Sequence, residues 1–427
     1  MTTAKRWLTS LSPWLAVPMI VLVVSLNLED GLRFATRGYW LTATTVASEA
    51  VAITGVVAAL GATWEASRLR RARVLALTSR NRLLVVAEAL VPTVVVVLTG
   101  TLVSYAMMAT IALGAPGGPA WHVVGVNLVA LTGIIGWGLF LGFALPPTLA
   151  LAVCLASTYV WYFVTAGSGS FPLWARYLSG GFLGDPAVWG VTDPRALGAA
   201  LVSALGLVTA GVCVVLSGDR SRALVAGSLA VVAAVGGGSL VARPLDHHPV
   251  VPRTGIECDD APVDGVTVCL WPELEADRET LVAEIVRQHQ TFSAMGLEPP
   301  STVSAAMEEP QEGIWIPLAP QTDPRSSVAA GFVEAFMPAA LPDSCEEFPD
   351  DTVVTVLAWL RTVAETEDHE EYRASIPAEP ARYLDEVLEL PPGEQGEWYL
   401  ANRPVMETCS ADPDTLDPRG LDSGATS

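Results

Sequence analysis

The sequence has few charged residues and only one lysine. Charged side chains make up 16% of its 427 residues, whereas a soluble domain usually carries about a quarter. This shortage argues against an ordinary soluble enzyme. The single lysine, Lys5, follows an alanine, but a P-loop needs a lysine after its glycines to reach the phosphates of a nucleotide. The sequence therefore contains no P-loop of its own.

Common motifs of catalysis and metal binding are also missing. The five histidines form no HExxH pattern, the six cysteines form no CxxC pair, and no GxSxG sequence occurs. Each of these spacings places metal ligands or a nucleophile together on one local element. We therefore predict that the protein is not an enzyme, binds no metal and needs no cofactor.

Charge divides the chain into two parts. Residues 1–244 hold 15 basic and 8 acidic side chains, a net charge of +7, whereas residues 245–427 hold 9 and 37, a net charge of −28. The basic excess lies between apolar segments and the acidic part would repel phosphate, so we predict no binding to nucleic acid. We expect a transmembrane domain at 1–242, a proline-containing linker at 243–257, an acidic domain at 258–412 and a disordered tail at 413–427.

Long apolar stretches indicate that the first part crosses a membrane. Residues 89–175 contain no charged side chain, and about 20 apolar helical residues cross a bilayer core of about 30 Å. The first segment could instead be a cleaved signal peptide, but it is long and its cleavage site is poor. We predict seven transmembrane helices, at Trp7–Leu28, Leu41–Trp64, Leu83–Leu113, Trp121–Leu145, Thr148–Ala166, Ala196–Leu216 and Ala223–Ala242.

The basic residues in the short connections predict the orientation. Cytoplasmic connections carry an excess of lysine and arginine. With the N-terminus inside, the cytoplasmic side receives ten basic residues and the outer side receives five. We therefore expect a multi-pass protein of the cell membrane with a cytoplasmic N-terminus. Because the number of spans is odd, the acidic domain would be extracytoplasmic.

The acidic domain combines one predicted strand with several predicted helices. Residues 265–270 alternate as a strand does, and apolar residues recur at helical spacing over 278–295, 351–365 and 381–390. The predicted fold class is a polytopic α-helical membrane protein of about seven transmembrane helices, followed by a mostly helical α+β extracytoplasmic domain.

The cysteines are divided between the two parts. Cys154 and Cys213 lie in predicted spans, where a cysteine usually serves as a small apolar packing residue. The other four lie in the acidic domain, and an even number outside the cell indicates disulfides. A metal site is the alternative, but the closest two cysteines are eleven positions apart. Three pairings are possible, and we favour the one that keeps each bridge local, Cys258–Cys269 with Cys345–Cys409.

Two glutamates lie within predicted spans, where ionisable residues often mark function. Glu88 is near the inner end of the third span, and we interpret it as an interfacial residue that faces the nearby arginines. Glu49 is in the outer third of the second span. Pairing or snorkelling to the outer interface and a functional role are both open for this residue.

An arginine-rich segment joins the second and third predicted spans. It runs from Trp64 to Arg82 and has two interpretations. It could be a positive-inside anchor that binds anionic membrane lipid, or a cytoplasmic helix that docks on an ATPase. The residues alone do not decide between them. In the second case, we expect the coupling residues to be Trp64, Glu65, Arg68, Arg70, Arg71 and Arg73.

Two segments of the membrane part resemble a known family. The pattern Trp64-Glu65-x-x-Arg68-x-Arg70-Arg71 and the aromatic segment 171–178 are similar to parts of the membrane subunits of type-2 ATP-binding-cassette exporters. The sequence around Cys258 and at 268–272 looks like the outer domain of actinobacterial members of that family. The resemblance covers about residues 1–280, and it implies a coupling helix in the first segment and re-entrant helices in the second. This chain departs from the family pattern by its seventh span.

The resemblance implies a membrane subunit that dimerises and works with a separate ATPase to move a hydrophobic or amphipathic substrate. A second reading is a non-transporting sensor or immunity protein whose outer domain binds a peptide or an envelope ligand. A third is a structural envelope protein. An ATPase gene adjacent to the gene of this protein would favour transport over sensing.

Overall fold

A computed structural model describes residues 7, 10–31, 38–77, 79–167, 172–184, 186–217, 219–245, 249–261, 265–306, 315–317, 323–338 and 350–408. The chain divides into two compact units, Met1–Val251 and Pro252–Ser427. The division falls inside the predicted linker, residues 243–257. The predicted tail, residues 413–427, lies outside the described ranges.

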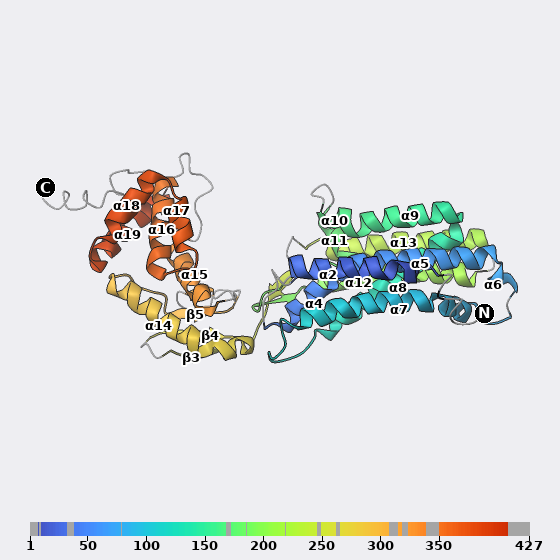
Figure 1. Ribbon diagram of the computed structural model, residues 1–427, viewed down its shortest axis with the longest axis horizontal. Helices are drawn as coiled ribbons and strands as arrows, with labels where there is room; N and C mark the ends of the chain where they lie inside the picture. Colours follow the sequence, from blue (N-terminus) through green and yellow to red (C-terminus); the bar gives the residue numbers. More distant parts are fainter. Residues whose placement is uncertain are drawn as a thin grey trace. The chain divides into compact units, whose positions relative to one another are not determined.

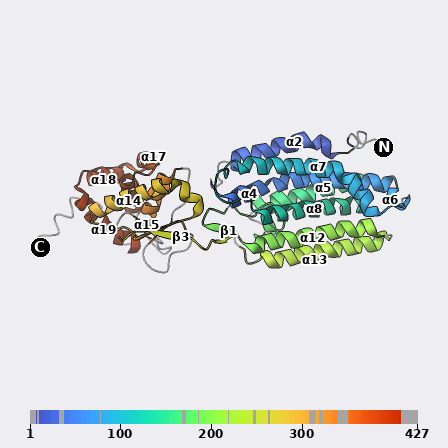
Figure 2. The same ribbon diagram turned by 90° about the horizontal axis from the view of Figure 1, so that it is seen from below.

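The first unit is a bundle of helices, and seven of its described segments are long and apolar enough to cross a membrane. This confirms the predicted fold class. The segments run alongside one another (Figures 1 and 2). They are α2 (Ser12–Leu26) with η1 (Asn27–Gly31), α4 (Trp40–Ser48) with α5 (Ala50–Arg71), α7 (Arg82–Ala109), α8 (Trp121–Ala144), α9 (Pro147–Tyr159) with η2 (Val160–Val164) and α10 (Thr165–Gly167), α12 (Pro194–Leu216), and α13 (Arg220–Ala242).

Helix α8 packs closely against both α5 and α12 because its contact faces are made of glycine. A Cβ atom on Gly138 would lie 2.4 Å from the carbonyl oxygen of Ala59 in α5, and one on Gly136 would lie 2.5 Å from that of Leu207 in α12. In membranes, small residues allow helix backbones to approach, and the resulting van der Waals contact drives association. The glycines of α8 therefore determine how the centre of the bundle is assembled.

Polar side chains join helices inside the bundle. The hydroxyls of Ser12 in α2 and Thr93 in α7 are 2.8 Å apart. Asn27 Nδ2 donates to Ser104 Oγ at 3.0 Å. Such contacts between membrane helices contribute about 0.6 kcal/mol each on average. They fix which faces of α2 and α7 meet, although most of the surrounding contact is apolar.

Short elements occupy the two ends of the bundle. Helix α6 (Val74–Leu77) follows α5 at one end, which we call the arginine-rich end. At the opposite end lie α11 (Trp174–Tyr177) and a two-stranded sheet of β1 (Gly190–Thr192) and β2 (Val250–Pro252). The amide of Asp193 donates to the carbonyl of Pro249 at 2.7 Å. Part of the predicted linker is therefore a strand anchored beside the start of α12.

The second unit is α+β, as predicted. Its sheet has the order β3-β4-β5-β6, in which β3 and β4 are antiparallel and the other pairs are parallel. The strands are β3 (Glu257–Asp260), β4 (Thr267–Leu270), β5 (Thr302–Ser304) and β6 (Trp315–Pro317). The helices are η3 (Pro272–Asp277), α14 (Arg278–Ala294), α15 (Pro324–Phe336), α16 (Asp350–Ala364), α17 (His369–Ser375), α18 (Ala378–Leu388) and α19 (Pro392–Thr408).

Large aromatic side chains form the core of the second unit. Phe292 of α14 stacks on Phe336 of α15 with ring centroids 4.5 Å apart, and Trp359 of α16 stacks on Tyr399 of α19 at 5.5 Å. The Tyr399 hydroxyl donates to the carbonyl of Phe336, and burial raises the pKa of Tyr399 to about 12. The aromatic contacts thus join α14, α15, α16 and α19.

Candidate functional site

The arginine-rich segment after the second span is mostly helical. Residues Trp40–Arg71 form one span of 32 residues, which at about 1.5 Å per residue is longer than a bilayer core of about 30 Å. The predicted span, Leu41–Trp64, lies within this helix, and the arginine-rich segment continues α5 for two more turns, up to Arg71. The helix ends at Arg71, and Arg73, two residues further on, has a left-handed φ of 56°, a conformation common just after a helix.

Three of the predicted coupling residues make contacts within the bundle. Glu65 is fully buried and forms an ion pair with Arg68 at 2.5 Å. Arg70 Nη1 donates to the carbonyl oxygen of Phe143 at 3.0 Å, in the last turn of α8. Carbonyls in the last turn of a helix have no intrahelical partner and carry partial negative charge, so arginine satisfies them. Glu65, Arg68 and Arg70 therefore stabilise this end of the bundle.

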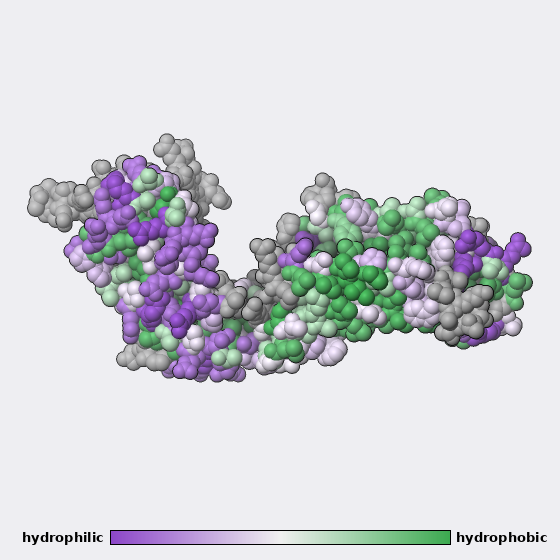
Figure 3. Space-filling model, viewed as in Figure 1, coloured by the Kyte–Doolittle hydropathy of each residue, from purple (hydrophilic) through white to green (hydrophobic). Residues whose placement is uncertain are grey.

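Arg71 and Arg73 are exposed at the arginine-rich end. The Arg71 guanidinium lies 5.9 Å from the ring centroid of half-buried Trp64, which leaves its charge accessible from solvent. In Figure 3, hydrophilic residues gather around this end, while the side of the bundle is largely hydrophobic. Of the six predicted coupling residues, Arg71 and Arg73 are those that offer charge to a partner.

The two glutamates in the spans differ in their surroundings. Glu88 forms an ion pair with Arg80 at 2.5 Å and its side chain is 43% exposed, which confirms the interpretation that it faces the nearby arginines. Glu49 is half-buried at the break between α4 and α5. Its amide donates to the carbonyl of Val46 at 3.1 Å, which is a tighter turn than in an α-helix. Glu49 thus marks a local irregularity in the second span.

The irregular segment between α11 and β1 packs into the bundle. Ser203 Oγ of α12 donates to the carbonyl of Leu178 at 2.6 Å. Gly180 has a φ of +74° and lies against Ala130 of α8 and Ala200 of α12. Irregular backbone is tolerated at membrane depth only where protein or water covers it. Helix α11 lies inside residues 171–178, the segment for which the family resemblance implies re-entrant helices.

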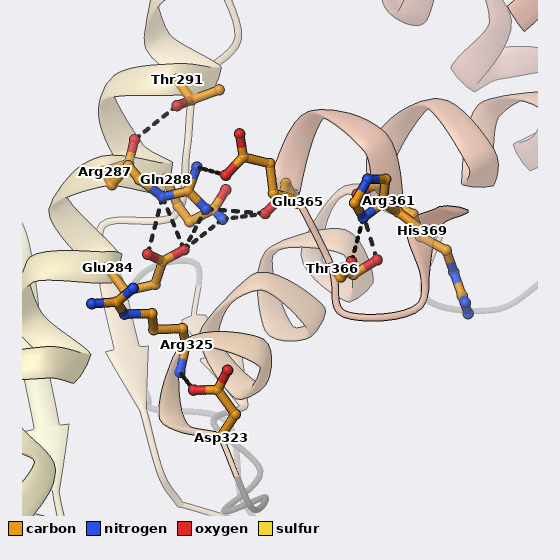
Figure 4. A network of polar contacts seen from close by, with 11 residues as sticks. Glu284, Arg287, Gln288, Thr291, Asp323, Arg325, Arg361, Glu365, Thr366 and His369 are labelled. Carbon is orange, nitrogen blue, oxygen red and sulfur yellow. Dashed lines mark hydrogen bonds and ion pairs between the residues drawn. The ribbon is translucent and has the colours of Figure 1, made fainter. Parts of the chain in front are cut away.

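The second unit contains a polar cavity of about 540 Å³. It is lined from α14, from the start of α15 and from the residues after α16 (Figure 4). On one side of the cavity, buried Glu284 is the centre of a network of hydrogen bonds. The charged and polar residues that line the cavity are Thr280, Glu284, Arg287, Asp323, Arg325, Ser326, Glu365 and Glu367.

Arg287 joins the walls of this cavity. It donates to both carboxylate oxygens of Glu284, with its closest approach at 2.6 Å, and to Glu365 at 3.0 Å. Hydrogen bonding to Glu284 raises the pKa of Arg287. Gln288 Nε2 donates to Glu284 at 2.9 Å and to the carbonyl of Ala364 at 2.7 Å. Glu284 and Arg287 are thus structural, whereas the side chains of Arg325 and Glu367 are exposed at the rim.

The disulfide prediction is confirmed where the structure describes it. Cys258 and Cys269 are bonded to each other and lie directly opposite on the antiparallel strands β3 and β4. The predicted partners Cys345 and Cys409 lie outside the described residues. Cys154 is a buried free cysteine and Cys213 a half-buried one, both in spans.

One comparison with known proteins gives a match. A family described as a domain of unknown function (DUF7224) matches residues 268–409, which form most of the second unit. No curated protein and no solved structure matches the chain. The match shows that most of the second unit is similar to this domain, and the description of the domain names no activity.

Proposed function

We propose that the protein is the membrane-spanning subunit of an ATP-binding-cassette-type export complex and that it works, as a homodimer, with a separate ATPase. The observation that carries the proposal is a pair of features at opposite ends of one bundle. Exposed Arg71 and Arg73 lie at one end, and the irregular segment after α11, which we interpret as re-entrant, lies at the other. This is the arrangement expected of a subunit that receives motion on one side and controls a path on the other.

Helix α5 is suited to carry that motion. It contacts α2, α7, α8 and α9 within the bundle, and its residues facing them are almost all buried. Because packed helices move as rigid elements, a displacement at Arg71 would reach the break at Glu49. The sequence has no P-loop, so ATP hydrolysis must take place in a partner.

The coupling prediction can be tested by reversing charge at the exposed arginines. In Arg71→Glu/Arg73→Glu, we expect co-purification of the ATPase from native membranes to fall at least tenfold, because charged groups at such interfaces contribute about 2–5 kcal/mol when one partner of a buried pair is removed. The bound ATPase is quantified by mass spectrometry against the full-length chain.

Arg222→Glu provides the matched control. Arg222 is exposed near the start of α13, at the same end of the bundle, and the change has the same sign. It should leave ATPase binding within twofold of wild type. Full binding by the double variant would contradict coupling through α5. If no ATPase co-purifies with the wild type, the transport proposal fails.

The proposed orientation places α6 in the cytoplasm and the second unit outside the cell. Ser79 and Ser293 are both exposed, so a cysteine at either site would react with a maleimide that can reach it. In intact cells treated with a membrane-impermeant maleimide, we expect Ser293→Cys to carry one more label than the protein without this substitution. Ser79→Cys should gain one only after permeabilisation, and the reverse pattern would invert the topology.

The polar cavity favours a second candidate function, a non-transporting sensor or immunity protein. With Arg325 and Glu367 exposed at its rim, the cavity offers both charge signs to a peptide or an envelope ligand. This candidate predicts no ATPase in the purified complex. It also predicts that Arg325→Ala abolishes the response to ligand without changing membrane insertion.

A further inference from the structure

An apolar cavity of about 80 Å³ lies among four spans of the bundle. Its floor comes from α8 and α12, and its walls come from α9 with η2 on one side and α13 on the other. Its lining residues include Trp137, Ser157, Trp161, Leu207, Val231 and Val235. The segment η2 is a π-helix, a distortion that occurs frequently at functional sites.

The cavity lies between two of the most lipid-exposed spans. In the apolar stretches that form the α9 and α13 spans, only 22% and 17% of the residues, respectively, are buried inside the protein. Helix α9 packs on α5 and α8, whereas α13 packs mainly on α12. In a bilayer, the exposed faces of these two spans would therefore meet the hydrocarbon of the membrane beside the cavity.

The lining favours hydrocarbon over water. Ser157 Oγ accepts a hydrogen bond from Trp137 Nε1 at 2.9 Å and donates to the carbonyl of Cys154 at 3.1 Å. A buried water needs two to four polar partners, and the one hydroxyl among the lining residues is already engaged by two groups. A segment of acyl chain fits the chemistry of these walls.

A positive charge lies on the short helix α11, which packs against one of the helices that line the cavity. Arg176 belongs to α11, which contacts α10 and α13. The residue two positions further on, Leu178, lies against Gly238 of α13. Gly238 is three residues beyond Val235, about 4.5 Å along the helix axis. Helix α11 thus lies close to the cavity, towards the C-terminal end of α13.

Arg176 makes no ion pair with any described residue. It is half-buried, and its Nε atom is buried with no hydrogen-bond partner in the described part of the chain. Its guanidinium lies 5.8 Å from the ring centroid of Tyr177. A half-buried guanidinium that meets no carboxylate among the described residues suits a phosphate group, which arginine binds in a bidentate manner.

We propose that α11 and the cavity together bind one anionic phospholipid, with its phosphate at Arg176 and an acyl chain in the cavity beside Trp161. The charge at α11 and the apolar walls below it match the two halves of such a lipid. The site is independent of transport, because it needs neither an ATPase nor the second unit.

Native mass spectrometry of the full-length protein in detergent tests the site with phosphatidylglycerol and phosphatidylcholine as probes. We expect the wild type to prefer phosphatidylglycerol by about fivefold, the effect of one arginine at a membrane surface. Arg176→Gln should remove the preference but keep binding. Val235→Trp, which fills the cavity, should lower the binding of both lipids at least fivefold, and Val231→Phe is a second filling variant should the first fail to fold.

Two neighbouring positions provide controls. Arg195 is exposed near the start of α12, and Val232, next to Val231, is 69% exposed. Arg195→Gln and Val232→Trp should bind both lipids as the wild type does. An unchanged headgroup preference in Arg176→Gln, or unchanged binding in both filling variants, would overturn the proposal. Because no ATPase is present in this assay, its outcome is independent of the coupling experiment.

Discussion

Replacing Gly136 by valine is expected to prevent correct assembly of the bundle. A Cβ atom at this position would lie 2.5 Å from the carbonyl oxygen of Leu207 and 2.9 Å from the Cα of Val208. Both are backbone atoms of α12, so neither can turn aside as a flexible side chain would. Overpacking a well-packed core typically costs about 1–3 kcal/mol, and here α8 and α12 must separate. We expect at least a tenfold loss of monodisperse protein in size-exclusion chromatography of membrane extracts.

Gly125→Val is the matched control on the same helix. A Cβ atom on Gly125 would have no neighbouring heavy atom within 4 Å, and the residue is exposed. The two substitutions add the same side chain to the same apolar helix, so they differ only in the approach of α12. Equal yields of the two variants would show that the close contact of α8 with α12 does not limit assembly.

The seven spans could be predicted because their signal is local. Absence of charge over a sufficient length suffices to identify a span, and the fourth was predicted at Trp121–Leu145 and found at Trp121–Ala144. The arginine-rich segment after Trp64 continues the helix of the second span as far as Arg71, which its charge alone does not indicate. Arginine is a good helix former, and Arg68 and Arg70 find partners in Glu65 and in the carbonyl of Phe143.

The second unit shows what a local pattern misses. The helix predicted at 381–390 is α18, which ends at Leu388, shortly before Pro391-Pro392. Pro392 also begins α19, because proline is favoured at the first position of a helix, where its missing amide hydrogen costs nothing. The short strands β5 and β6 carry too few residues to show an alternation.

The candidate sites depend on distant residues and could not be predicted in detail. Arg287 contacts Glu365, which is 78 positions away, and no spacing in the sequence indicates that pairing. The sequence likewise does not indicate that Arg70 faces the bundle while Arg71 is exposed, because this difference depends on where α8 ends. The part of the site that was predicted, the helix bearing the arginines, is the part that one segment encodes.

Trp359→Ala is expected to unfold the second unit. Trp359 is fully buried, and its ring packs against Trp398 at 5.8 Å and Tyr399 at 5.5 Å between centroids. Removing a buried tryptophan costs about 3–5 kcal/mol, a large part of the roughly 5–15 kcal/mol that stabilises a domain. Limited trypsin digestion of the full-length protein should cleave this unit at least tenfold faster, while the bundle of α2 to α13 stays intact.

Two further variants test the position: one separates the packing of the Trp359 ring from its hydrogen bond, and the other is a control at an exposed side chain. The indole Nε1 of Trp359 donates to Gln395 Oε1 at 2.9 Å, so Trp359→Phe removes this hydrogen bond but keeps most of the packing. A buried acceptor left without a donor costs about 1–3 kcal/mol, and cleavage should therefore be intermediate. Leu400→Ala, at a side chain that is 50% exposed on α19, should be cleaved as slowly as the wild type. If Trp359→Ala were equally resistant, α16 and α19 would not depend on this aromatic contact, and the packing of the second unit would have to come from the Phe292 cluster.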